Sequence, residues 1–198
     1  MPHEIPDYMS PDYVASKTEI DVLWLQLQTL QSMAEEFGIR DIFQDNGAKI
    51  LQQLVYLNFK ACAGREGNDA IDINGCEWEM KSINIATGIS GISTNHHLNH
   101  DIIAKYRTIP WSIAIYYNAK LLKIYVIGAE QLEPFLTLCE TKLETRSTLN
   151  NPKISLSYVE ENGILIYDCE TMEYPIDPMT VIDTTIYLPL QEEYRNNH

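Results

Sequence analysis

Basic residues are scarce in this sequence. Its 198 residues include 14 Lys and Arg against 28 Asp and Glu, giving a formal net charge of −14 at pH 7. No apolar run is long enough for a signal peptide or a membrane span, and the four cysteines form no CxxC pair. We therefore expect a reduced cytoplasmic protein with no membrane contact. The 45% hydrophobic content predicts one globular domain with a real core.

The shortage of basic charge argues against a nucleic-acid enzyme, because phosphate contacts dominate affinity for nucleic acids. The acid lies mainly at the two ends, however. Residues 1–47 hold two basic and nine acidic residues, and residues 158–198 hold one and nine. Residues 48–157 carry a net charge of +1. The acidic ends are interpreted either as a solubilising surface or as a device that weakens non-specific DNA binding.

Residues 64–85, GREGNDAIDINGCEWEMKSINI, form the most informative segment. Asn74-Gly75 is a strong signal for a tight β-hairpin turn. We expect two strands, at roughly 69–73 and 76–83, that fold back on each other. Strand side chains alternate between faces, so Glu79 and Lys81 should point one way while Trp78 and Met80 point the other.

Asp69 should then approach Glu79 at the open end of this hairpin. Mg²⁺ is held in proteins by one or two carboxylates together with substrate phosphate oxygens, and Asp69 and Glu79 supply such a pair. Lys81 is suited to stabilise the transition state or to orient a water molecule, and Glu66 is a further oxygen ligand within reach. The pattern predicts a metal-dependent DNA nuclease. The alternative is ordinary cross-strand pairing of charges on an exposed surface.

The same segment resembles the active-site hairpin of the PvuII-type restriction endonucleases, a branch of the PD-(D/E)xK nuclease superfamily. Four further blocks are similar to that family in the same order and at similar spacing: DIFQDNGAKILQ at 41–52, STNHHLN at 93–99, IIAKYRTIPW at 102–111 and NNPKI at 150–154. The resemblance implies a type II enzyme, a homodimer that cuts both strands of a short palindrome with Mg²⁺. It further implies the site CAGCTG and blunt ends.

The resemblance also assigns roles to residues. Asp69, Glu79 and Lys81 match the catalytic triplet. Glu66 and Tyr106 match family residues that lie near the metal ions. The DNA-binding set comprises Asp45 at the minor-groove side, His96 and His97 at base edges, their block neighbours Ser93 and Asn95, the phosphate-contact candidate Lys105, and the pair Asn150 and Asn151.

The residue types suit these DNA-binding roles. A histidine ring carries a donor and an acceptor, so it can address the acceptor-rich edge of guanine. The alternatives are a metal site for His96 and His97, a plain turn for Asn150-Asn151, and a solvated basic face for Lys105 and Arg107. Asn95 stands where the family has a third histidine, and the loop before it is one residue longer. Both departures put the target specificity in doubt and leave the cleavage chemistry untouched.

The periodicity predicts an α/β protein with the restriction-endonuclease-like fold: a mixed, mainly antiparallel central sheet flanked by helices. One nuclease domain should span 1–198, with an irregular extension at 1–15 and an acidic C-terminal extension from about 168. The expected helices lie at about 16–37, 48–60, 99–107 and 129–145, and the further strands at about 111–117, 120–127, 154–158 and 163–168. Thr184–Leu188 is a candidate added strand.

The first of these helices is predicted to form the homodimer interface, with Trp24 and Leu27 either at the seam or in the core of their own subunit. Two other functions are kept as alternatives. A DNA repair or junction nuclease would use broader basic surfaces, and the His96-His97 loop argues against it. A non-cleaving DNA-binding protein on the same fold is opposed by the intact triplet Asp69, Glu79 and Lys81.

Overall fold

The computed structural model describes residues 11–36, 47–62 and 68–197. Six strands form one central sheet in the order β1-β2-β3-β5-β6-β8. The strands are β1 (Lys60–Ala61), β2 (Ala70–Ile71), β3 (Glu77–Asn84), β5 (Trp111–Tyr117), β6 (Lys120–Ile127) and β8 (Ile164–Asp168). Only the β3–β5 pair within this sheet is parallel. The predicted mixed, mainly antiparallel sheet is therefore confirmed.

The parallel pair requires a crossover connection from β3 to β5. That connection contains the 3-10 turn η1 (Ile85–Thr87), the short strand β4 (Gly91–Ser93) and helix α3 (His100–Tyr106). β4 pairs with β7 (Lys153–Ser155) in a separate two-stranded sheet. Most of the predicted DNA-binding residues lie in this crossover, so the topology itself gathers them on one side of the sheet.

The predicted β2–β3 hairpin is confirmed. Gly75 has a φ of 86°, in the left-handed region that glycine adopts without steric cost. The Asp72 carboxylate accepts hydrogen bonds from the backbone N–H groups of Asn74 and Cys76, at 2.8 and 3.0 Å, and from the Trp78 ring N–H at 3.0 Å. This side chain ties the turn to the strand that carries Glu79.

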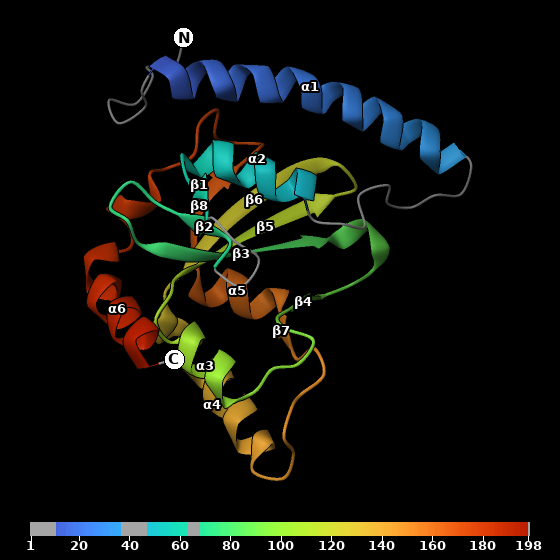
Figure 1. The fold of residues 1–198 in the computed structure, drawn as a ribbon. Helices are drawn as coiled ribbons and strands as arrows, with labels where there is room; N and C mark the ends of the chain where they lie inside the picture. Colours follow the sequence, from blue (N-terminus) through green and yellow to red (C-terminus); the bar gives the residue numbers. More distant parts are fainter. Residues whose placement is uncertain (1–10, 37–46, 63–67, 198) are drawn as a thin grey trace.

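Helices cover both faces of the sheet (Figure 1). Helices α1 (Pro11–Glu36) and α2 (Gly47–Leu57) pack on one face, where Trp78 and Met80 belong to the same apolar cluster as Tyr56. The opposite face is covered by α3, α4 (Ala129–Leu143) and α5 (Leu156–Asn162). Its cluster includes Ile83, from β3, and Leu132, from α4. Strand β3, which carries Glu79 and Lys81, thus has apolar clusters on both faces.

Helix α1 begins earlier than predicted. It starts at Pro11, a residue favoured in the first helical turn because it has no N–H to leave unpaired. The expected irregular segment at 1–15 is therefore wrong for residues 11–15, and its remainder lies outside the described residues. Trp24 lies in this chain's own core, where its ring N–H donates to the Ala119 carbonyl. The seam interpretation of Trp24 is therefore wrong.

The C-terminal part of the chain departs most from the prediction. The strand expected at 154–158 ends at Ser155, whose side chain caps α5 by accepting from the N–H of Tyr158. Residues beyond β8 form the 3-10 turns η2 (Pro178–Thr180) and η3 (Thr184–Ile186), followed by helix α6 (Tyr187–Asn197). The added strand expected at Thr184–Leu188 is wrong: Asp183 caps a helical turn there instead.

Across the described residues, none of the helices is both long and apolar enough to cross a membrane. The four cysteines are free thiols.

Candidate active site

Glu79 and Lys81 lie side by side on β3, as the alternation of strand side chains predicted. The Lys81 ammonium donates a hydrogen bond to Glu79 Oε1, and the two groups form an ion pair. Both side chains are largely shielded from solvent. Trp78 and Met80 project into the apolar cluster under α1 and α2.

Asp69 is fixed beside Glu79 by the hairpin. Its backbone N–H donates to the Trp78 carbonyl at 3.1 Å, and its carboxylate Oδ2 accepts from the Met80 N–H at 2.8 Å. The backbone on either side of Glu79 therefore holds Asp69 in place. The three residues predicted to be catalytic do converge at the open end of the hairpin.

The electrostatics of Glu79 suit a cation site. Only 8% of this residue is exposed, and burial raises the pKa of its carboxyl group above the ordinary value of 4.5. Lys81 opposes that rise, and the nearby negative charge of Asp69 adds to it. Two carboxylates and one ammonium leave a net negative charge in a poorly solvated place. A divalent cation would relieve that cost.

Tyr106, from α3, closes one side of the site. Its hydroxyl lies 3.5 Å from Glu79 Oε1 and 3.4 Å from the Thr94 carbonyl oxygen. Burial and the Glu79 charge raise the pKa of this phenol well above its usual range, so the group stays protonated and donates hydrogen bonds. Its ring meets the Trp111 ring edge to face, 4.7 Å away. The Trp111 ring also lies 5.7 Å from the Lys81 nitrogen. The sequence predicted only that Trp111 begins a strand. It carried no signal that Trp111 belongs to this site.

Lys105, in the last turn of α3, and Arg107, which caps the end of that helix, behave differently. The Lys105 ammonium lies close enough to lower the pKa of both the Glu79 carboxyl and the Cys62 thiol, although burial raises the pKa overall in each group. Arg107 binds the carboxylates of Glu133 and Glu140 on α4, with N–O distances of 2.7–3.2 Å. A phosphate contact by Arg107 would have to compete with these two carboxylates, and it stays a prediction.

The predicted metal ligands are only partly described. Asp69 and Glu79 are in place, whereas Glu66 lies outside the described residues. The part of the chain that the structure covers holds no group of three His, Cys, Asp or Glu arranged for a metal. Two buried polar atoms beside the site, Asn68 Oδ1 and Trp111 Nε1, have no hydrogen-bond partner among the described residues. An oxygen acceptor and an N–H donor in that position fit a hydrated cation and its water molecules.

The predicted DNA-binding residues gather on the β4–β7 sheet. Thr94 donates from its N–H and its hydroxyl to the Pro152 carbonyl, at 3.2 and 2.8 Å. The Asn151 N–H donates to the Asn95 carbonyl at 3.0 Å, and its side chain donates to the Ser93 hydroxyl at 3.2 Å. Two segments more than fifty residues apart are thereby joined into one surface.

His96 and His97 are exposed at the turn that follows β4. Asn95 shapes this turn, because its side-chain oxygen accepts from the His97 N–H at 2.8 Å. The carbonyl of Thr94, the residue before Asn95, accepts from the Tyr106 hydroxyl at 3.4 Å. The turn is thus linked to the Asp69–Glu79 site through one residue. Asn150 is exposed on the adjoining segment, and Asp45 lies outside the described residues.

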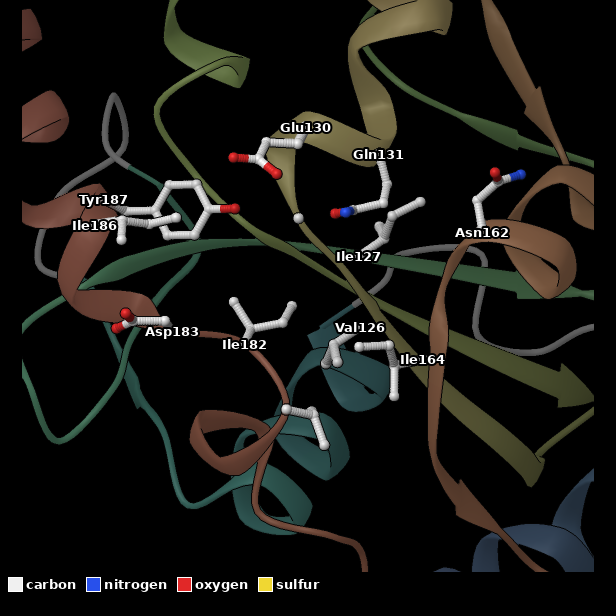
Figure 2. Close-up of a pocket in the computed structure, with 12 residues that line it drawn as sticks. Val126, Ile127, Glu130, Gln131, Asn162, Ile164, Ile182, Asp183, Ile186 and Tyr187 are labelled. Carbon is white, nitrogen blue, oxygen red and sulfur yellow. The ribbon is translucent and has the colours of Figure 1, made fainter.

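A cavity of about 210 Å³ lies elsewhere, between the C-terminal segment and the start of α4 (Figure 2). Its lining includes Ile164, Ile182 and Ile186 and contains none of the predicted site residues. Figure 2 shows Tyr187 and Gln131 reaching toward the beginning of α4. The Ala129 N–H there donates to the Tyr187 hydroxyl at 3.1 Å. This cavity is formed by the docking of the C-terminal segment and takes no part in the carboxylate site.

Residues 15–167 match the family described as Restriction endonuclease PvuII. That range covers well over half of the sequence and contains the β2–β3 hairpin, the β4–β7 surface and α3. Residues 168–198, with η2, η3 and α6, fall outside the match. The chain belongs to the PvuII restriction endonuclease family and is a type II site-specific deoxyribonuclease, an enzyme that binds double-stranded DNA and uses a divalent metal.

Proposed function

We propose that this cytoplasmic enzyme hydrolyses both strands of CAGCTG to blunt ends, as a homodimer and with Mg²⁺. The observation that carries the proposal is the buried Glu79 carboxylate, with Asp69 beside it and the Lys81 ammonium hydrogen-bonded to it. This arrangement supplies oxygen ligands for a hard cation and one positive charge for a phosphate. The alternatives, a repair or junction nuclease and a non-cleaving DNA-binding protein, are separated by the experiment below.

Asp69 and Glu79, with Glu66, would hold the Mg²⁺, which when bound lowers the pKa of water and neutralises charge on the phosphate. Lys81 would orient the attacking water and stabilise negative charge that builds up on the phosphorus. Tyr106 would keep Glu79 in position through the hydrogen bond that its hydroxyl donates to the Glu79 carboxylate. Its contacts make it a supporting hydrogen-bond donor beside the metal.

DNA would be read by the surface built on β4 and β7. His96 and His97 are exposed at its turn and offer ring donors and acceptors to base edges. The other members of the proposed interface are Ser93, Asn95, Asn150 and Asn151 beside them, Lys105 at a phosphate and Asp45 at the minor groove. The hydrogen bonds between Thr94 and Tyr106 and between Asn151 and Ser93 support the idea that reading and cleavage are mechanically linked.

The role of His97 is open to a direct test. His97→Ala should reduce discrimination between CAGCTG and single-base variants by about 1–3 kcal/mol for each lost base contact. The measurement is the ratio of specific to variant-site affinity at fixed salt. His100→Ala is the control, because His100 is also exposed but lies beside Glu140. An equal loss of affinity on every sequence would make His97 a phosphate contact instead.

Helix α1 would provide the homodimer interface. Its inner edge is buried through Ile20 and Trp24, whereas Val22, Leu23 and Leu25 are 46–62% exposed. Large apolar side chains adjacent on a helix surface mark a protein contact. Leu25→Asp should convert the dimer to a monomer in sedimentation analysis, while Gln26→Asp, at an exposed neighbour, should leave it dimeric. A dimer that survives Leu25→Asp would place the interface elsewhere.

The deciding experiment is digestion of a fully sequenced plasmid by the purified protein with Mg²⁺, followed by sequencing of the fragment ends. Discrete blunt fragments ending within CAGCTG would support the whole proposal. Discrete fragments ending at a different palindrome would support the restriction-enzyme assignment and overturn CAGCTG as the recognition sequence. A smear would favour a repair-type nuclease, and no cleavage by folded, metal-supplied protein would favour a DNA-binding protein that has lost catalysis.

A further inference from the structure

The strand that carries Glu79 begins next to β2 on one side, but its other side has no strand partner before Glu79. β3 starts at Glu77, but its parallel partner β5 joins it only from Glu79, opposite Trp111. The Glu79 N–H donates to the Pro110 carbonyl at 3.1 Å on that side. Backbone groups two residues apart on a strand face the same neighbour, so the N–H and C=O of Glu77 also face the space before β5. Left there without partners, they would weaken the strand just before the catalytic residue.

Gln191 of α6 fills this space. Its side-chain oxygen accepts from the Glu77 N–H at 2.9 Å, and its nitrogen donates to the Glu77 carbonyl at 3.0 Å. The same nitrogen lies 3.1 Å from the Thr108 carbonyl and 3.3 Å from Cys76 Sγ. Only 3% of Gln191 is exposed. One amide thus replaces a residue of a neighbouring strand and ties β3 to the loop between Tyr106 and Trp111.

A second contact from α6 reaches the same place. Arg195 forms an ion pair with Glu77 at 3.2 Å, and the other oxygen of Glu77 accepts from the Asn68 side chain. Asn68 directly precedes Asp69. The helix therefore binds the backbone leading to Glu79 through Gln191. It reaches the residue next to Asp69 only indirectly, because Arg195 binds the Glu77 carboxylate that accepts from Asn68.

We propose that Gln191 is a positioning residue for the metal-binding pair Asp69 and Glu79, and that the C-terminal extension thereby completes the active site. The inference rests on the proposed metal-dependent cleavage. It goes beyond the family match, which ends at residue 167. Gln191 touches neither reacting atoms nor metal ligands. It acts by fixing the start of β3 and the 108–110 loop, between which the Glu79 backbone is held.

The test compares two variants of the same extension. Gln191→Leu keeps the side-chain volume and removes all the amide contacts. Tyr187→Phe is the matched control, because it removes one buried hydrogen bond of the same helix, to the Ala129 N–H, and none to Glu77. Both variants should lose some thermal stability, since each leaves a buried backbone group without its partner. Activity is therefore compared at a temperature where both remain folded.

Two readouts separate positioning from stability. Gln191→Leu should cut saturating DNA about 10- to 100-fold more slowly in a single turnover, because small displacements of a catalytic group cost that much. Calorimetric titration with MnCl₂ in the absence of DNA should show several-fold weaker binding. DNA affinity measured without metal should stay within about threefold, and Tyr187→Phe should match the wild type in all three assays.

If folded Gln191→Leu cleaves DNA and binds metal as well as the wild type does, Gln191 is not a positioning residue. The enzyme assignment would remain intact. Equal losses in Gln191→Leu and Tyr187→Phe would reduce the effect to stability and overturn it as well. A wild-type protein that neither binds metal nor cleaves DNA would instead refute the proposed function on which the inference rests.

Discussion

Two acid–base clusters in this molecule combine the same chemical groups with opposite results. Each contains two carboxylates and one basic side chain: Asp69, Glu79 and Lys81 in the first, and Glu133, Glu140 and Arg107 in the second. In the first, burial dominates and the pKa of Glu79 is raised. In the second, Arg107 hydrogen bonds dominate and the pKa values of Glu133 and Glu140 are lowered. The first cluster is left in need of a cation, whereas the second already has its partner.

The difference separates a site from a structural link. Arg107 presents a planar fork that satisfies both carboxylates at once, and the α4 side of that cluster remains open to water. Lys81 offers one compact charge to a carboxylate that is 8% exposed. Counting ion pairs would rank the Arg107 cluster first, whereas desolvation supports the proposal that the Glu79 cluster is the active site.

The largest expected effect comes from making the same substitution in each cluster. Glu79→Gln should lower the single-turnover cleavage rate at least about 10³-fold, because it removes a metal ligand where charge develops. Glu133→Gln should leave the rate within about twofold. Both single-turnover rates are measured with saturating enzyme. If Glu133→Gln slows cleavage more than Glu79→Gln does, the contrast drawn between the two clusters is wrong.

Thermal stability measured over a pH series without metal should change in opposite directions for variants of the two clusters. The raised pKa of Glu79 means that its stabilising contribution is present below pH 4.5 and is lost as the pH rises through the folded-state value. The lowered pKa of Glu133 means that its contribution is present above 4.5 and is lost as the pH falls through its folded-state value. Relative to wild type, Glu79→Gln should therefore gain in melting temperature as the pH rises, and Glu133→Gln should lose. Parallel curves would contradict the assigned environments.

The smallest expected effect is that of Arg107→Ala. An ion-pair cluster open to water contributes about 1 kcal/mol to folding, even with favourable geometry. We expect a loss of that size in urea denaturation, with cleavage within about threefold of wild type. A cleavage defect much larger than the stability loss would show that Arg107 serves the active site or the DNA after all.

The sequence was most predictive where a structure depends on neighbouring residues. Asn74-Gly75 specifies the hairpin turn because glycine tolerates a φ of 86°, and the alternation around Trp78 and Lys81 follows from that strand. The strands predicted at 111–117 and 120–127 also match β5 and β6. In each case the information lies within a few residues of the element it specifies.

Prediction failed where distant contacts decide the outcome. The β-branched run at 184–186 favours a strand, but the burial of Tyr187 and Gln191 against the body draws it into helical turns. Gln191 itself carries no sequence signal, because its main partners are backbone groups 83 and 114 residues away. The sequence also could not show that α4 supplies two carboxylates to Arg107, because Glu133 and Glu140 lie 26 and 33 residues away.

The ladder between β4 and β7 has a consequence for how target preference can change over evolution or in the laboratory. Gly91 pairs with Ser155 and Ser93 with Lys153, so the two segments share one register. A shift of one residue in either segment would turn its side chains to the opposite face. New specificities should therefore arise by exchanging residues 91–99 and 149–155 together as a cassette. Transplanting either segment alone should yield a folded enzyme with impaired discrimination.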